Sequence, residues 1–270
     1  MKTSTEFSVS SSAYKKRLGI TPDVVELAKK SLLESAKMEE KRKPESSEVI
    51  VKEDVSLDDF LDYRKSDLRL PVRLYLRDGK IIINEIPTVI HATVSALFKV
   101  FMGRWNYRDL RYGDDTTMIL NQNNVKEPDS WVRPVRRPRP PLTQAMDRLG
   151  TPYPTMIVEV GHAQSLPDLH WKVELYFDVR TTIQIVLTIK IYEPRVDHTA
   201  AMIAALYLFQ STSGLLGRQG LQMFLTYQMN IPATELFDGD PAGVPASAIG
   251  GFNLDLWEFQ VVIRESFNIA

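Results

Sequence analysis

The chain has no cysteine, and this absence removes several kinds of chemistry at once. Without thiols there is no disulfide framework, no Cys-ligated zinc or iron–sulfur centre and no thiol nucleophile. Any metal site must therefore use oxygen and nitrogen ligands. The sequence also lacks a phosphate loop of the GxxxxGK[ST] or GxGxxG type and a serine nucleophile elbow. Nucleotide hydrolysis and dinucleotide redox chemistry consequently lose support.

Long apolar runs are missing as well. The amino-terminal stretch MKTSTEFSVSSS contains Glu6 and no apolar core, so it is unlike a secretory signal. The most apolar stretch, HTAAMIAALYLFQSTSGLLG, is interrupted by polar residues after Phe209. It falls short of the roughly 20 apolar residues that a membrane helix needs. We therefore expect an intracellular protein, nuclear or cytoplasmic, that has no membrane partner.

Charge is nearly balanced overall, but it is not evenly distributed. The 270 residues include 33 Lys and Arg against 34 Asp and Glu, for a net charge of -1. Residues 1–66 contain many charges of both signs, and their net charge is zero. The net charge is +4 for residues 67–190 and -5 for residues 191–270. We expect residues 1–66 to form a charged N-terminal arm, partly disordered or helical, and 67–270 to form one α/β domain.

Periodicity and turn residues predict the elements of both parts. Thr21 and Pro22 open a helical stripe that extends to about Met38. Asp78-Gly79 joins two β-type runs and predicts a tight hairpin. In the domain, the strands TMIVEV and TIQIVLTIKIY flank a helix that Ser165 caps, and a last helix ends the tail, whereas AMIAALYLF and LQMFLTYQM fit strand or helix. The expected fold is a mixed central β-sheet flanked by helices.

Three residues in this pattern suggest phosphodiester chemistry. Asp129 follows Pro128 at an expected strand, Glu159 lies in the apolar strand MIVEV, and Lys172 lies in the following helix. Two carboxylates on adjacent strands can bind Mg²⁺ through hard oxygen ligands. A lysine beside them can orient the attacking water and balance charge that develops on a phosphate. The competing interpretation is that Lys172 is solvated and pairs only with acids on its own helix.

These stretches resemble a known superfamily. EPDSWVRP, PTMIVEVG and LHWKVELYF, preceded by DGKIIINEIPTVIHATV with His91 near the start of a helix, are similar to the PD-(D/E)XK nucleases. The similarity is greatest to the restriction-endonuclease-like branch, and the chain resembles a eukaryotic-type member of that branch. The similarity covers about Leu70 to Tyr192. Lys172 and Tyr176 match that branch's helical K-xxx-Y pattern.

The resemblance implies a restriction-endonuclease-like fold and metal-dependent cleavage of DNA. Asp129 and Glu159 would then hold Mg²⁺ or Mn²⁺, with an additional metal-water contact from Glu85, and Lys172 would assist the water. Two positions differ from the commonest pattern: Gly161 stands where the lysine would follow the glutamate, and Thr155 stands where branch members often carry an acid. These differences motivate an alternative, an inactive nuclease-fold module that binds nucleic acid or a protein partner.

The run VRPVRRPRPP follows the Asp129 strand and is expected to be a surface loop. Its arginines are candidates for contacts with substrate phosphates, which favours nucleic acid, DNA in the first place, as the partner. A solvated linker and a proline-rich segment bound by another protein fit the same residues. Gln164 and Tyr176 are further candidates for lining the substrate site, although Gln164 fits an ordinary loop residue equally well. A homodimer is compatible with all of this. The candidate arginines are Arg133, Arg136, Arg137 and Arg139.

Overall fold

The computed structural model describes residues 18–38, 48–65, 72–83, 88–162, 164–195, 197, 199–209, 220–223 and 227–268. These residues divide into two compact units. The first contains residues 18–38, 48–65, 72–83 and 122–124, and the second contains the rest of the described chain. The expected boundary at residue 66 falls within the first unit, so the extent of the independently folding domain stays a prediction.

The first unit is a three-stranded antiparallel sheet with two helices. Helix α2 (Pro22–Met38) begins and ends at the predicted residues, and α3 (Leu57–Arg64) is capped by the Ser56 side chain, which accepts from the Asp59 N–H. The sheet contains β1 (Val49–Lys52), β2 (Leu74–Arg77) and β3 (Lys80–Ile83), with β3 in the centre. The predicted hairpin is confirmed, because Asp78 and Gly79 both have positive φ, 49° and 75°, as a type I′ turn requires.

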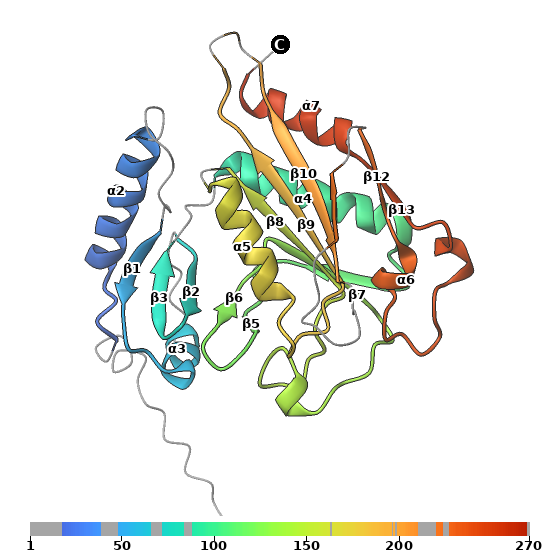
Figure 1. Ribbon diagram of the computed structural model, residues 1–270, viewed down its shortest axis with the longest axis horizontal. Coiled ribbons are helices and arrows are strands. Elements are labelled where there is room, and N and C mark those ends of the chain that lie inside the picture. Colours follow the sequence, from blue (N-terminus) through green and yellow to red (C-terminus); the bar gives the residue numbers. More distant parts are fainter. Residues whose placement is uncertain are drawn as a thin grey trace, which may run out of the picture. The chain divides into compact units, whose positions relative to one another are not determined.

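The second unit is built on a six-stranded mixed sheet in the order β11-β10-β9-β8-β7-β4 (Figure 1). The strands β8 and β9 are parallel and the other neighbours are antiparallel. A parallel pair needs a crossover, which α5 supplies between β8 and β9. Six elements form this sheet: β4 (Leu110–Gly113), β7 (Ser130–Pro134), β8 (Met156–Gly161), β9 (Ile185–Ile191), β10 (Met202–Leu208) and β11 (Gly220–Met223).

Helices cover both faces of this sheet. Apolar residues of α4 (Val89–Asn106) and α7 (Leu256–Ser266) pack with one set of strand residues, which includes Val158 and Val160. Residues of α5 (Leu166–Tyr176) pack with the alternate set, which includes Ile157, and Figure 1 shows α5 lying across β8 and β9. The mixed α/β architecture predicted from the sequence is confirmed.

Smaller elements complete the second unit: β5 (Met118–Ile119), β6 (Val125–Lys126), η1 (Leu142–Gln144), β12 (Gln228–Ile231), α6 (Ala233–Leu236), η2 (Ala246–Ala248) and β13 (Phe252–Asp255). The two open apolar runs now have assignments. AMIAALYLF contains β10, and the described part of LQMFLTYQM contributes to β11 and β12. Among the described residues, no helix combines the length and apolarity of a membrane span.

Two local expectations around β7 were wrong. Asp129 precedes the strand, which begins at Ser130, and the strand extends through Arg133 to Pro134 although a loop was expected there. Proline is tolerated because it is the last residue of the strand, where a missing N–H removes little of the ladder. The ladder continues from the next residue, because the Val135 N–H donates to the Asp109 carbonyl at 2.8 Å.

The close approach of α5 to β8 gives a first prediction, at Gly161. A Cβ atom at this position would lie 2.8 Å from Leu169 Cδ1 of α5. We expect Gly161→Ala to lower the free energy of unfolding by about 1–3 kcal/mol, the usual penalty for overpacking. Urea unfolding measures the change. Gly250→Ala is the matched control, because no atom lies within 4 Å of the added Cβ. Equal stabilities of the two variants would contradict the argument.

Candidate functional site

The candidate site is centred on a carboxylate inside the apolar strand β8. All six residues of β8 are buried, and Glu159 is 1% exposed. Side chains alternate along a strand, so Glu159 lies on the same face as Ile157 and faces α5. An ionised carboxylate in such a place is very unfavourable unless charged or hydrogen-bonding partners compensate it.

Helix α5 supplies those partners. Lys172 Nζ lies 2.7 Å from Glu159 Oε2, and the Tyr176 hydroxyl donates to Glu159 Oε1. Lys172 and Tyr176 are four residues apart, which places both on one face of the helix. The start of α5 is fixed by Ser165, whose hydroxyl accepts from the Asp168 N–H at 3.2 Å, as the sequence predicted. The structure therefore brings the predicted residues Glu159, Lys172 and Tyr176 together.

A second ammonium group, Lys126 at the end of β6, acts on the same carboxylate. Burial alone would raise the pKa of Glu159, but the positive charges of Lys172 and Lys126 outweigh it, together with hydrogen bonds from Lys172 and Tyr176. The pKa is therefore held below its ordinary value. Lys126 is 3% exposed, and its Nζ lies 5.0 Å from the centre of the Trp171 ring. Sequence inspection missed this lysine, because it is 33 residues from Glu159 along the chain.

Asp129 is adjacent to this cluster but has a different set of partners. Its Oδ2 accepts the Val160 N–H at 2.5 Å, so the side chain extends the β7–β8 pairing beyond Ser130, the first residue of β7. Its Oδ1 lies 3.0 Å from Nε2 of the buried His91 on α4. The backbone carbonyl of Asp129 accepts from the Ser95 hydroxyl at 2.8 Å. Asp129 thus accepts from the backbone of Val160, the residue after Glu159. The partners of the Glu159 carboxylate lie on α5, which covers the other face of the sheet from α4.

The two positions that differ from the family pattern have structural explanations. Leu169 of α5 lies in the space that a side chain at position 161 would enter, so a larger residue there would have to displace Leu169. Thr155 is buried, and its hydroxyl donates to the Leu236 carbonyl at 2.6 Å. Directly across from Gly161 on β9 is Lys190, whose Nζ donates to the His162 carbonyl at 2.5 Å.

Gln164 lies in the turn between β8 and α5. It is 1% exposed, and among the described residues neither atom of its side-chain amide has a hydrogen-bond partner. A buried amide without partners is destabilising by about 1–3 kcal/mol, so such a group is uncommon unless it meets a ligand or a water molecule. This environment is consistent with the predicted role of Gln164 in lining a substrate site, which stays a prediction.

The predicted arginines do not lie beside Glu159. β7 is antiparallel to β8, with Ser130 opposite Val158 and Val132 opposite Met156, so the run from Arg133 onward leads away from the Glu159 end. Arg136 forms ion pairs with Asp109 and Asp240, at 3.3 and 3.2 Å.

Arg137 is committed to similar contacts. It lies 3.4 Å from Asp238 and donates to the Tyr153 carbonyl at 3.0 Å. Burial, the largest influence, lowers the pKa of the Arg137 guanidinium, although Asp238 partly opposes this. A role of this run in binding substrate stays a prediction.

The last predicted ligand, Glu85, lies outside the described residues. In the described part of the chain, no group of three or more His, Asp or Glu side chains is arranged so that it could hold a metal ion. Of the predicted ligands, Asp129 and Glu159 are described, and their carboxylates contact helices on opposite faces of the sheet, α4 and α5 respectively.

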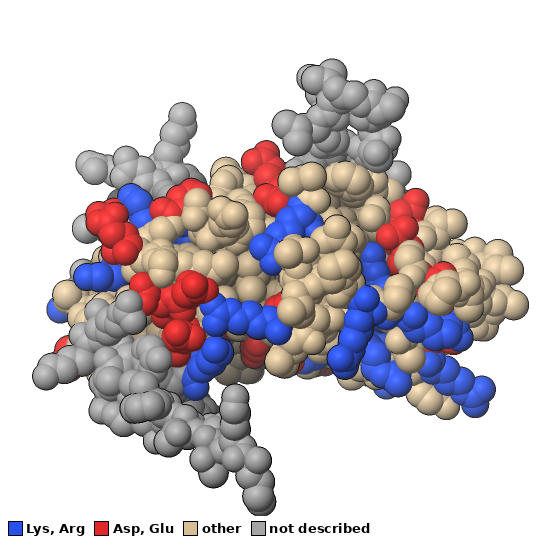
Figure 2. Space-filling model, turned by 90° about the horizontal axis from the view of Figure 1, so that it is seen from below, with Lys and Arg blue, Asp and Glu red and all other residues tan. Residues whose placement is uncertain are grey.

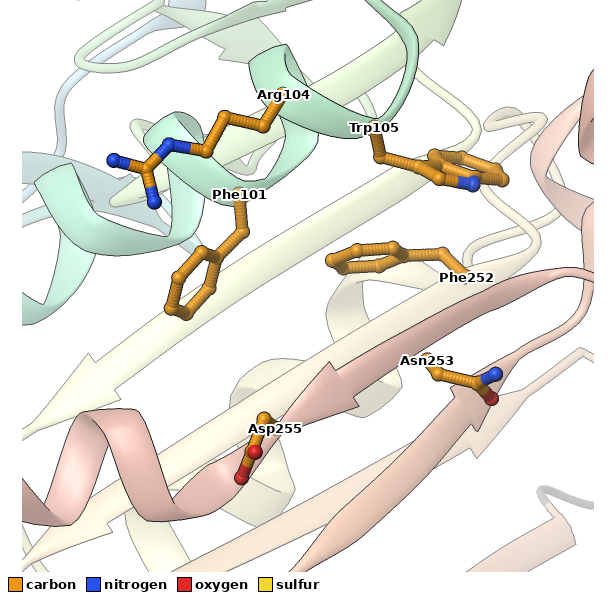
Figure 3. A pocket seen from close by; sticks show the side chains of 6 residues that line it. All are labelled: Phe101, Arg104, Trp105, Phe252, Asn253 and Asp255. Carbon is orange, nitrogen blue, oxygen red and sulfur yellow. The ribbon is translucent and has the colours of Figure 1, made fainter.

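A separate concavity lies on the α4 face of the sheet. It encloses about 300 Å³ between α4 and β13. Figure 3 shows Trp105 and Phe252 at its centre, with ring centroids 5.1 Å apart, and Phe101 beside them. Its carboxylate, Asp255, caps α7 by accepting the Trp257 N–H at 2.9 Å. The pocket is aromatic, and it is lined by none of the residues that surround Glu159.

The Glu159–Lys172 pair gives a prediction on stability. Lys172→Met removes the ammonium group that hydrogen-bonds to the buried Glu159 carboxylate and leaves it only the charge of Lys126, and we expect a loss of about 3–5 kcal/mol in the free energy of unfolding. The double variant Glu159→Leu/Lys172→Met removes both charges and should recover most of this loss. Denaturant unfolding of wild type, Lys172→Met, Glu159→Leu and the double variant measures the coupling. Additive losses would indicate that the two charges are independent.

The lowered pKa of Glu159 predicts how this stabilisation depends on pH. A carboxyl group whose pKa is lower in the folded protein stabilises it above the unfolded-state pKa, and the effect disappears as pH falls through the folded-state pKa. The stability difference between wild type and Glu159→Gln should therefore be constant near neutrality and shrink below the ordinary value of 4.5. Unfolding curves from pH 7 downward measure it. Glu174→Gln, on the exposed side of α5, should produce almost no difference at any pH.

Two comparisons with known proteins found matches to this chain. The chain matches a family model, Uma2, described as "Putative restriction endonuclease", over residues 57–228. A similar solved structure is a crystal structure from Anabaena variabilis ATCC 29413, titled a putative nuclease belonging to DUF820. It is 16% identical, with a TM-score of 0.49, and the match covers 77% of this chain and 99% of that one.

No curated protein matches the chain. Neither finding bears on the expected eukaryotic type. The family model covers well over half of the chain, including β8, α5 and all three residues first singled out, Asp129, Glu159 and Lys172. The chain therefore belongs to the Uma2 family of restriction-endonuclease-like proteins.

Proposed function

We propose that this protein is a metal-dependent endonuclease that hydrolyses phosphodiester bonds of DNA. The observation that carries the proposal is the buried Glu159 carboxylate, which contacts Lys172 and Tyr176. The next residue of the strand, Val160, donates its backbone N–H to Asp129. Replacing a buried ion pair by apolar residues is often neutral or stabilising, so a buried pair is weak evidence of a purely structural role. A chemical role explains why the charges are there. Membership of the Uma2 family supports a nuclease-like activity.

The donor groups of the chain fit a hard divalent cation. Mg²⁺ is commonly bound by one or two carboxylates and completes its octahedron with water and substrate phosphate oxygens. In this proposal Asp129 and Glu159 supply the two carboxylates, each from its own side of the β7–β8 pair. When bound, Mg²⁺ or Mn²⁺ would polarise the phosphate and lower the pKa of a water molecule.

The other residues have distinct roles in the proposal. The Lys172 ammonium group donates a hydrogen bond to Glu159. With substrate present, it also donates to a phosphate oxygen on which negative charge develops. Tyr176 fixes the second oxygen of Glu159, and His91 fixes Asp129, so both act as positioning residues. The buried amide of Gln164 contributes a donor and an acceptor for the substrate.

The alternative is an inactive module that binds nucleic acid or a protein through the same fold. It is favoured by the saturation of the carboxylates, because both oxygens of Glu159 and both of Asp129 contact protein groups. In that case the cluster only stabilises the sheet. The two functions differ in one measurable property, metal-dependent cleavage.

The test is cleavage of supercoiled plasmid and of single-stranded DNA with Mg²⁺ or Mn²⁺. We expect wild-type cleavage to stop when EDTA is added. Glu159→Gln, Asp129→Asn and Lys172→Met should each lower the rate by about a hundredfold or more, as for the loss of an electrostatic or acid–base group. Glu174→Gln on the exposed side of α5 is the matched control and should cleave as wild type does.

Each contrary outcome has a definite meaning. Cleavage that survives both Glu159→Gln and Asp129→Asn would exclude these residues as the reaction centre. Absence of cleavage by correctly folded wild-type protein with either metal and either substrate would favour the inactive module. Circular dichroism and the unfolding curves described above identify variants that fail because they do not fold.

A further inference from the structure

Two arginines face each other across the edge of the six-stranded sheet. The last strand at this edge is β4, and Arg111 of β4 is directly opposite Arg133 of β7. Like charges directly opposite on antiparallel strands repel and destabilise the pair. Within the described part of the chain, the Arg111 guanidinium donates to the backbone carbonyls of Tyr107 and Leu110 and forms no ion pair. Among the described residues, Arg111 therefore has no acidic partner that would offset the repulsion.

Arg133 is the more constrained member of the pair. It is partly buried, its Nε is buried without a hydrogen-bond partner among the described residues, and its guanidinium lies 5.9 Å from the centre of the Trp131 ring. Burial first, and then the charge of Arg111, lowers the pKa of Arg133, while Asp147 opposes the effect and Arg139 adds to it.

The one acid that acts on Arg133, Asp147, is committed elsewhere. Its carboxylate accepts from the backbone N–H groups of Leu149 and Thr151, both at 2.9 Å, and from the Thr151 hydroxyl at 2.6 Å. These contacts close the loop before β8. The positive charge of Arg111, Arg133 and Arg139 is therefore not neutralised by ion pairs in the described structure, in contrast to Arg136 and Arg137.

The arginine pair lies on the same face of the sheet as Glu159. Trp131 is opposite Ile157, so Arg133 and Glu159, each two residues farther along its own strand, share the face of Ile157. They lie in opposite directions along the strands. At about 3.3 Å per residue, the four residues between the level of Arg133 and that of Glu159 span roughly 13 Å. This is about four base pairs of duplex DNA at 3.4 Å each.

We infer that Arg111 and Arg133 form a phosphate-binding surface, the β4–β7 arginine surface, which holds the backbone of a nucleic acid whose reacting phosphate lies at Glu159. The inference rests on the proposed function. It replaces the arginine run expected from the sequence with a cluster formed across two strands. Figure 2 shows Lys and Arg side chains gathered on one part of the face that it draws. Bound phosphates relieve the repulsion between Arg111 and Arg133.

The test measures binding without cleavage. A fluorescent 24-base-pair duplex and a single strand of the same length are titrated with protein in EDTA, at several salt concentrations. Arg111→Ala and Arg133→Ala should each weaken binding of all sequences alike and reduce the slope of log Kd against log salt by about one. Arg195→Ala, which removes an exposed arginine from the loop after β9, is the matched control and should leave the slope unchanged.

The outcomes separate this inference from the proposed function. If cleavage depends on Glu159 but neither arginine variant changes binding, the β4–β7 arginine surface is wrong and the function stands. If binding depends on the arginines but no metal supports cleavage, the surface stands and the protein is a binding module. Unchanged binding together with self-association of Arg111→Ala would overturn the inference, since the arginines would then serve to protect the edge strand β4.

Discussion

The buried charge of Glu159 is the constraint on which the second unit depends. A carboxylate in the middle of a strand that is otherwise apolar is tolerated only when ammonium and hydroxyl groups surround it. Lys172 and Tyr176 satisfy this requirement from α5, and Lys126 adds a second positive charge. The pair therefore ties β8 to α5 in one register, because any rotation of the helix would leave two charges buried without partners.

The position of the lysine follows from how closely the helix packs on the strand. With Leu169 packed against Gly161, a side chain two residues after the glutamate would have to displace this leucine. A lysine on the helix reaches the same carboxylate from above the sheet. Tight packing of α5 and a lysine carried by that helix are thus two parts of one arrangement, and Thr155 has a structural hydrogen bond in place of an acid.

The two carboxylates are supported from opposite faces of the sheet. Glu159 contacts α5, whereas Asp129 contacts His91 of α4 and the backbone N–H of Val160. Substrate binding would have to engage both, and the β4–β7 arginine surface lies about 13 Å along the strands on the Glu159 face. Nucleic acid bound there would thus follow the sheet from its edge toward the end of β8. The aromatic pocket between α4 and β13 lies on the other face.

The sequence by itself determined the features that depend on short separations along the chain. The turn residues Asp78 and Gly79 fixed the hairpin, Ser165 fixed the start of α5, and the four-residue spacing placed Lys172 and Tyr176 on one helix face. The apolar strand around Glu159 likewise indicated that its carboxylate is buried, and a buried carboxylate needs a compensating partner. These features follow from local backbone geometry, in which periods of 3.6 and 2 residues decide which side chains are neighbours.

Only the tertiary structure decided which distant segments meet. Lys126 and His91 reach the two carboxylates because strand order and helix packing bring them there. The direction of β7 carried the arginine run away from Glu159, and its pairing with β4 placed Arg111 opposite Arg133. Such contacts depend on the register between strands that are far apart in the sequence, and local periodicity carries no information about that register.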